Sequence, residues 1–212
     1  MQDIRNRASP SRFFALNGAL VAAQKILIID KQFGGLLNLG SCTMPADLSQ
    51  WVMKCYDHVK SELVIPNRDR IPVDAESVYR IWGLPNSGLK VCYEMKQDII
   101  RSINEEYGFP GINAPKKTAW CKMIKEMNGA ADDRFLRAWA VVAFDYFLAP
   151  TTGLKVSPRS YPAVNDVKLL SRTNIYQFVV DQIRIAFGAL GNKKSVVCCV
   201  FHLVVSKHTH IN

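Results

Sequence analysis

The chain has 212 residues, 49% of them hydrophobic, so it is long enough to bury a sizeable core as one large domain or two small ones. Ten prolines and twelve glycines are ordinary numbers for a globular chain and argue against wholesale disorder. The 27 basic and 18 acidic residues give a formal net charge of +9, which favours an acidic partner, but the basic residues form no block of five or more. We therefore expect scattered, solvated charge, with sequence-independent nucleic-acid binding as the alternative.

The start of the chain is polar and lacks the apolar core of a signal peptide. No stretch reaches the roughly 18 uninterrupted apolar residues that a membrane span requires. The six cysteines are interpreted as reduced and mostly buried, since Cys55 and Cys121 lie inside helical patterns. These observations predict a nuclear or cytosolic protein.

Residues 1–15 are predicted to be a flexible tail. Residues 16–29 then have the pattern of a helix with Gly18 as a weak point, and residues 31–40 that of a glycine-broken apolar turn. In the next predicted helix, apolar residues recur at the spacing of one helical face: Leu48, Trp51, Val52, Cys55 and Tyr56. This face is expected to pack against the core.

Residues 62–73 are predicted to form a short β-hairpin, because two apolar runs flank the turn formers at 66–69. The following helix begins at Asp74, a good N-cap residue. It ends at Gly83, because glycine can adopt the left-handed conformation that closes a helix.

Two further helices are predicted near residues 94–107 and from about residue 118. The most informative segment is 132–148, whose apolar residues leave almost no polar face. Such a helix is buried on most sides, so we expect it at the centre of the fold.

Residues 151–172 are expected to be an irregular connection. Asn174 can then cap a strong helix that is closed by Gly191. The apolar run over 196–205 could be a helix or a strand, because its periodicity does not decide between them.

The predicted architecture is thus mainly α. One helical domain covers residues 16–205, with about seven helices and a short β-hairpin near residues 62–73. The remaining residues form a flexible N-terminal tail, 1–15, and a disordered C-terminal tail, 206–212.

Three stretches, taken together, resemble the plant mobile domain, which is sometimes labelled aminotransferase-like. It is most similar to the version found upstream of ubiquitin-like-protein-specific cysteine protease regions in transposon-derived plant proteins. The stretches are Phe33-Gly34-Gly35-Leu36-Leu37 with Leu48-Ser49-Gln50-Trp51-Val52, then Ile71-Pro72-Val73-Asp74-Ala75-Glu76-Ser77-Val78-Tyr79-Arg80-Ile81-Trp82-Gly83-Leu84-Pro85, and Phe144-Asp145-Tyr146-Phe147-Leu148-Ala149-Pro150-Thr151-Thr152.

The resemblance covers about residues 20–205 and implies a helical fold linked to mobile-element biology or nuclear silencing. It brings no catalytic residues. The chain departs from the family pattern at Gln32, where a glycine usually precedes the Phe-Gly-Gly element, and after Val205, where we expect a truncated terminus.

No catalytic residue or cofactor is predicted. A cysteine protease needs a thiolate, a histidine base and an orienting acid brought together, whereas His58 is interpreted as a cation at the end of a helix. Gly34 and Gly35 lack the surroundings of a phosphate-binding loop and are expected to form a turn. No lysine is singled out for the Schiff base that a true aminotransferase would require.

No metal site is predicted either. Cys198, Cys199 and His202 form a Cys-Cys-x-x-His string, with His208 and His210 beyond it. Zinc prefers four tetrahedral ligands that usually come as two spaced pairs. We therefore expect core packing and a frayed tail at this string.

Asp145 is the residue with the most unusual predicted setting, because a carboxylate inside a buried helix should be paired. Arg134, Arg137 or a distant arginine could serve, and a structural ion pair is favoured over a catalytic acid. The four tryptophans are expected to be core anchors rather than base-stacking platforms: Trp51, Trp82, Trp120 and Trp139.

These expectations combine into a non-enzymatic, transposon-derived interaction or scaffold domain that acts in the nucleus. Protein partners are expected, nucleic acid is an alternative partner, and no membrane or small-molecule substrate is expected. Two other functions remain open: an inactive remnant of a protease-bearing transposon protein, and a weak sequence-independent nucleic-acid binder.

Overall fold

The computed structural model describes residues 5–6, 10–40, 45–68, 70–86, 88–191 and 195–209. This part of the chain is mainly α-helical, as predicted. Its α-helices are α1 (Pro10–Gly18), α2 (Ala22–Asp30), α3 (Ala46–Cys55), α4 (Ala75–Trp82), α5 (Gln97–Glu106), α6 (Lys117–Glu126), α7 (Asp133–Ala143), α8 (Tyr161–Val164), α9 (Ile175–Gly188) and α10 (Val200–Thr209). Short 3₁₀ segments cover Gly34–Asn38, Pro158–Ser160 and Val167–Arg172, and a π-helical turn covers Phe144–Leu148.

The strands are short and form two small sheets. β2 (Tyr56–Asp57), β3 (Glu62–Val64) and β4 (Arg70–Pro72) form an antiparallel sheet in that order. Leu63 faces Ile71 across the β3–β4 pair, and both side chains are buried. The hairpin predicted near residues 62–73 is therefore confirmed. β1 (Arg5–Asn6) pairs in parallel with β5 (Ser195–Val196), which precedes α10.

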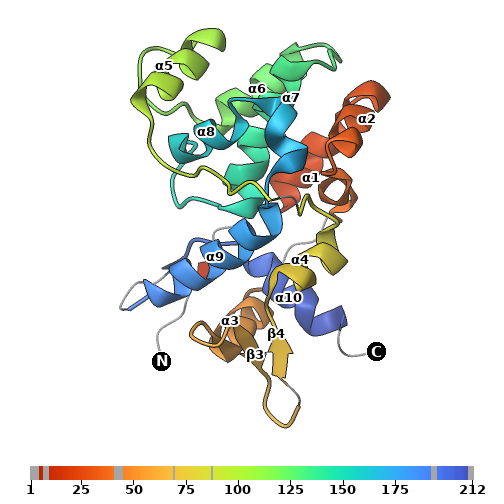
Figure 1. Cartoon of the computed structure of the whole chain (residues 1–212), viewed down its shortest axis with the longest axis vertical. Helices are drawn as coiled ribbons and strands as arrows, with labels where there is room; N and C mark the ends of the chain where they lie inside the picture. The colour runs from red at the N-terminus through yellow and green to blue at the C-terminus, as the bar shows by residue number, and fades with distance from the viewer. Residues whose placement is uncertain are drawn as a thin grey trace.

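The helices are arranged in two groups joined by α9 and α4 (Figure 1). One group holds α1, α2 and α5 to α8, and the other holds α3, α10 and the β3–β4 hairpin. α4 packs against α9, and α10 packs against both α3 and α4. α9 therefore lies where the two groups meet.

The centre of the core is α7 and the π-helical turn that continues it. Every residue from Ala138 to Ala149 is buried, as expected for this apolar segment. The N-cap is Asp132, whose side chain accepts a hydrogen bond from the Phe135 N–H at 2.8 Å. The central position predicted for residues 132–148 is confirmed.

Two sequence-predicted helix ends also have the expected geometry. The Asp74 carboxylate accepts from the Ser77 N–H at 2.8 Å and so caps α4. Gly83 closes the same helix with a φ of 54°, in the left-handed region.

The predicted tails are shorter in the structure. α1 begins at Pro10 and buries Phe13 completely against Trp139, so the boundary at residue 16 was wrong. The first predicted helix is divided at Gly18, where α1 ends. At the other end, α10 continues to Thr209 and buries Ser206, so residues 206–209 are not a disordered tail. Residues 210–212 lie outside the described part.

The predicted glycine-broken turn brings the backbone at Gly35 into close contact with the backbone at Trp82. A Cβ added to Gly35 would lie 1.6 Å from the carbonyl oxygen of Trp82, so only glycine fits here. Gln32, just before this element, has a φ of 63°. The left-handed backbone explains why glycine would suit position 32.

None of the described helices is both long and apolar enough to cross a bilayer. The described cysteines are all free thiols, with Cys198 and Cys199 buried and the other three partly buried. Cys42 lies outside the described residues.

Candidate functional site

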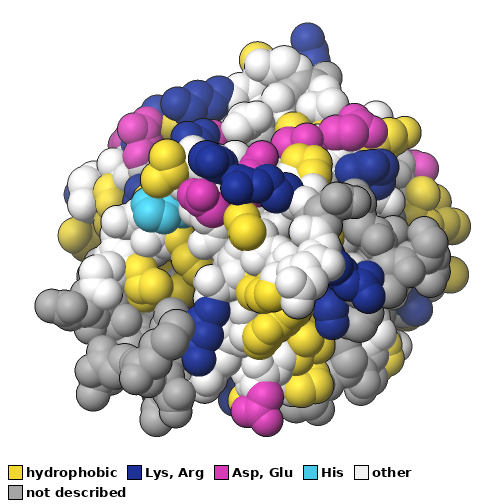
Figure 2. Space-filling model, turned by 90° about the horizontal axis from the view of Figure 1, so that it is seen from below, with side chains coloured by type: hydrophobic (Ala, Val, Ile, Leu, Met, Phe, Trp, Pro, Cys, Tyr) yellow, Lys and Arg dark blue, Asp and Glu magenta, His cyan; other side chains and the backbone are white. Residues whose placement is uncertain are grey.

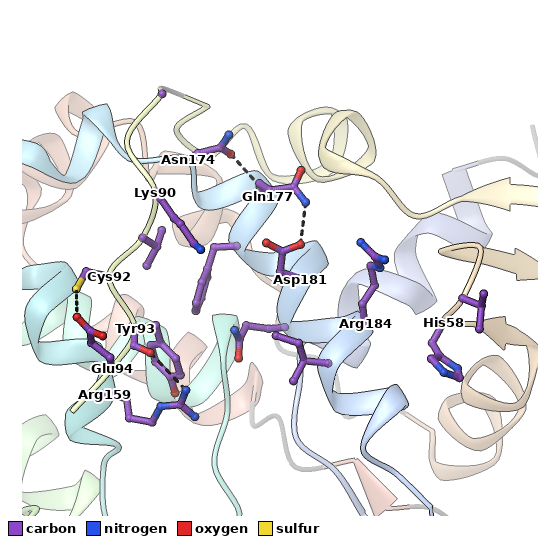
Figure 3. Close-up of a pocket in the computed structure, with 16 residues that line it drawn as sticks. His58, Lys90, Cys92, Tyr93, Glu94, Arg159, Asn174, Gln177, Asp181 and Arg184 are labelled. Atoms are coloured by element: carbon purple, nitrogen blue, oxygen red, sulfur yellow. Dashed lines mark hydrogen bonds between the residues drawn. The ribbon is translucent and has the colours of Figure 1, made fainter.

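A groove of about 1160 Å³ runs between α9 and the chain segment over residues 88–94. The segment forms one wall and α9 the other (Figure 3). Arg159 lies at one end of the groove and His58 at the other. The groove therefore follows most of the length of α9.

The start of α9 fixes the segment in place. Asn174 caps the helix by accepting from the Gln177 N–H at 2.9 Å. The Asn174 N–H donates to the Leu89 carbonyl at 2.7 Å, and the Leu89 N–H donates to the Arg172 carbonyl at 3.2 Å. The two walls are thus joined by backbone hydrogen bonds at one end.

The lining is partly apolar. Val91 and Phe178 are buried beneath it, and the ring of Tyr93 meets Phe178 edge to face at 5.2 Å. Two apolar side chains remain in water, since Ile185 is 62% and Val59 76% exposed. Exposed apolar side chains beside a hollow are typical of interaction sites.

The acidic side chains of the groove already have polar partners. Glu94 lies 3.1 Å from the Lys96 ammonium, and Asp181 accepts from the Gln177 side-chain amide at 2.9 Å. Lys90 and Arg184, in contrast, make no ion pair with any described residue.

Arg159 is held over the Tyr93 ring, with its guanidinium carbon 4.7 Å from the ring centre. It also donates to the Tyr93 carbonyl at 3.4 Å. These contacts fix one cation at the end of the groove.

A thiol, a histidine and carboxylates all line the groove, but they do not converge. Cys92 Sγ donates to the Glu94 carboxylate at 3.2 Å, and burial together with this carboxylate raises the pKa of the thiol. His58 lies at the opposite end of the groove (Figure 3). Cys92 is therefore held as a thiol, far from a base that could activate it.

His58 does not lie at the end of the helix that precedes it, where it was predicted, and the helix end beside its ring belongs to α9. α3 ends at Cys55, and His58 follows β2 instead. Its ring is next to Gly188, at the end of α9.

The Cys-Cys-x-x-His string is part of the core, as its apolar surroundings suggested. Cys198, Cys199 and His202 are all fully buried. Burial raises the pKa of Cys198 well above its usual value and that of Cys199 to about 12. The described residues contain no group of three or more His, Cys, Asp or Glu that could hold a metal ion. His208 and His210 lie outside the residues whose side chains are described.

His202 links α10 to α4 through both ring nitrogens. The Trp82 indole N–H donates to Nδ1 at 3.1 Å, so the neutral ring carries its proton on Nε2 and donates it to Ser77 Oγ at 3.0 Å. Burial lowers the pKa of His202 to about 3. The histidine is thus a neutral, hydrogen-bonded part of the core.

Asp145 has a structural partner, but not an arginine. Its Oδ2 lies 2.8 Å from the Lys117 ammonium, without the geometry of a hydrogen bond. Its Oδ1 accepts from the Thr151 hydroxyl at 3.1 Å and the Ser157 N–H at 3.0 Å. Burial raises the pKa of Asp145 despite the opposing effect of Lys117.

The two arginines suggested as partners of Asp145 lie elsewhere. Arg137 pairs with Glu106 of α5, and Arg134 lies over the Tyr107 ring at 5.3 Å. Both come from the first turns of α7, whereas Asp145 lies in the π-helical turn at its other end.

Three of the four tryptophans are core residues as predicted. Trp82, Trp120 and Trp139 are buried, and Trp139 donates to the side-chain oxygen of Asn17 at 2.9 Å. Trp51 is 36% exposed and is covered by the Lys207 ammonium at 5.1 Å from its ring centre. Its prediction as a core anchor was therefore wrong.

Comparison with protein-family models identifies the family of this chain. A family model described as "Domain of unknown function (DUF8566)" matches residues 6–204. The chain belongs to this family. No curated protein and no solved structure matches it.

The resemblance to the plant mobile domain was wrong, because the DUF8566 model is the one that matches. The stretches that carried the resemblance encode a backbone contact at Gly35, helix caps at Asp74 and Gly83, and a buried central helix. Unrelated helical domains need the same devices, so these stretches do not identify a family.

Proposed function

We propose that this DUF8566 domain is a non-catalytic protein-interaction domain that binds a polypeptide segment in the groove beside α9. The observation that carries the proposal is an open groove of about 1160 Å³ with exposed apolar side chains and two cations, Lys90 and Arg184, that make no ion pair with any described residue. Pockets for drug-sized ligands are usually about 300–1,000 Å³ and bury most of the ligand. A long, open groove suits a segment of polypeptide better.

The placement of the reactive groups favours binding over catalysis. Nucleophilic catalysis needs the nucleophile within hydrogen-bond distance of its base. Here Cys92 and His58 lie at opposite ends of the groove, and the pKa of the Cys92 thiol is raised. His202, the other histidine whose side chain is described, is buried and neutral.

The distribution of charge favours a protein partner over nucleic acid. On the face shown in Figure 2, Lys and Arg side chains are interspersed with acidic and hydrophobic ones and do not form one basic field. Nucleic-acid binding depends on several neighbouring phosphate contacts. Nuclear localisation stays a prediction.

A matched pair of substitutions tests the proposal. Ile185 in the groove and Ile26 on α2 are similarly exposed, at 62% and 57%. We expect the domain to retain peptides from a random library, and Ile185→Ser to weaken the retained peptides about tenfold, since burying an isoleucine contributes roughly 1.5–3 kcal/mol. Binding would be measured by fluorescence anisotropy.

Ile26→Ser should leave these affinities unchanged, and circular dichroism should show both variants folded. Equal affinities for the two variants would remove the groove as the binding site. Retention of no peptide, or tight binding of duplex DNA that weakens steeply with salt, would reject the proposed function itself.

A further inference from the structure

Helix α2 has a buried apolar side and an exposed apolar side. On the inner side Ile28 is fully buried, and the Gln24 side-chain amide donates to the Ala130 carbonyl at 2.9 Å. On the outer side Ile26 is 57% and Ile29 55% exposed. A helix that is apolar on both sides is normally covered on both. The outer side of α2 is not covered by any described part of the chain, and such exposed apolar faces are typical of interaction sites.

This outer side is accessible to a large partner. α2 lies at the outer edge of the helix group that also holds α1 and α5 to α8 (Figure 1). It packs against the Gly34–Asn38 segment and α7, which cover its inner side. A second folded chain can therefore approach α2 from outside the molecule.

The residues on and beside the exposed face have the spacing of a parallel coiled coil. Ala22, Ile26 and Ile29 are separated by four and then three residues, so they form one stripe along the helix. Lys25 and Asp30 lie on opposite flanks of this stripe and are five residues apart. In a parallel helix pair, a residue on one flank meets the residue five positions later on the opposite flank of the partner helix. The face of α2 is therefore complementary to itself.

The two flanking charges are available for such a contact. Lys25 and Asp30 make no ion pair with any residue that the structure describes. A two-fold axis parallel to the helices would form the Lys25–Asp30 pair twice, once on each side of the apolar stripe. In an antiparallel pair each flank would meet the same flank of the other helix, and Lys25 would not face Asp30. The charges therefore favour the parallel arrangement.

We infer that a second copy of the chain packs against this face, with the two α2 helices parallel about a two-fold axis. Ile26 and Ile29 of one copy contact the same residues of the other. The nine residues of α2 span only about 14 Å, so the contact is smaller than a standard interface of about 800 Å² per partner. The association is accordingly weak, with a dissociation constant on the order of 0.1 mM. It does not involve the groove beside α9.

Sedimentation velocity of the full chain at concentrations from about 0.01 mM to about 1 mM tests the inference. Dimers should accumulate over this range. Ile26→Ser and Ile29→Ser should each weaken dimerisation about tenfold or more, because every substitution enters the interface twice. Ile185→Ser is the matched control, since Ile185 is 62% exposed but lines the groove. Its dimerisation should equal that of the unaltered chain.

A charge swap tests the parallel arrangement. Lys25→Glu and Asp30→Lys each place like charges opposite one another, and each should weaken dimerisation about three- to tenfold at low salt. The double variant regains two pairs of opposite charge and should dimerise as the unaltered chain does. Asp30→Lys also puts a cation in the last turn of α2, where the helix dipole favours it. A weaker dimer in this variant would therefore not reflect a weaker helix.

Several results would overturn the inference. A chain that stays monomeric at every concentration would show that a second copy does not cover the α2 face. Dimerisation that survives both Ile26→Ser and Ile29→Ser, in variants that circular dichroism shows to be folded, would place the contact elsewhere. Failure of the double charge variant to recover would reject the parallel arrangement.

Discussion

Charged and hydrogen-bonding side chains occur in two settings in this domain, the core around α7 and α10 and the groove beside α9. In the core, Asp145 is paired with Lys117, and both ring nitrogens of His202 have partners. In the groove, Lys90 and Arg184 make no ion pair with any described residue. Polar groups that water cannot reach must be satisfied by the fold, whereas those in an open groove remain available to a ligand.

Removing one partner of the buried ion pair should have the largest effect. Lys117→Met leaves the Asp145 carboxylate buried without its cation, and we expect a loss of about 3–5 kcal/mol in the free energy of unfolding at neutral pH. The loss should shrink as the pH falls, because the buried carboxyl, with its raised pKa, then takes up a proton more readily in the folded state than in the unfolded state. Urea denaturation at several pH values measures both.

Lys122→Met is the matched control. The Lys122 side chain is 76% exposed and pairs with Glu126 one helical turn away. Such a pair contributes about 0.3–0.5 kcal/mol. Similar losses for the two lysines would show that the Lys117–Asp145 pair is no more important than a surface contact.

The second-largest expected effect is a loss of folding stability at low pH that is caused by His202. Its pKa is lowered to about 3 in the folded state, against an ordinary value of 6.5. Below pH 6.5 the unfolded chain therefore binds a proton that the folded chain does not. His202 should lower the free energy of unfolding by about 1.4 kcal/mol for each pH unit between 6.5 and 3.

His202→Gln should remove this part of the pH dependence, and His58→Gln, at an exposed position, should keep it. The comparison is made by urea denaturation between pH 6.5 and pH 4.5, taking each variant against the unaltered chain. An unchanged slope in His202→Gln would contradict the neutral, buried state of the ring.

Local patterns were sufficient to predict much of the core. The apolar residues of 132–148 predicted a central helix, and Asp74, Gly83 and Asn174 have the capping roles expected of them. These features depend on residues within one or two helical turns. α1 was missed because the polar residues before Phe13 suggested a tail, although Phe13 is followed by the apolar residues Phe14, Ala15 and Leu16.

Partners that lie far apart in the sequence could not be predicted. The burial of Asp145 implied a cation, but nothing in the sequence distinguishes Lys117 from the other lysines. His202 meets Ser77 and Trp82 only because α10 packs against α4. The apolar run over residues 196–205, most of which lies in α10, has no clear hydrophobic period. The sequence therefore left open whether it forms a helix or a strand.

The groove was also missed, because its walls come from separate segments of the chain. Periodicity identifies the buried face of one element and not a hollow between two. One signal was present in the sequence. Ile185 lies off the apolar face of α9 that contains Val179 and Ile183, and an apolar residue on a polar face can mark a binding surface.

The smallest expected effect separates the two settings most directly. Lys90→Glu, Arg184→Glu and Ile185→Ser should each change the free energy of unfolding by less than about 0.5 kcal/mol, since all three side chains are exposed. Thermal and urea unfolding measure this. A loss of several kcal/mol for Arg184→Glu would mean that this cation holds the fold together, as Lys117 does. The groove would then be a second satisfied polar site, and its charges would not be free to recognise a partner.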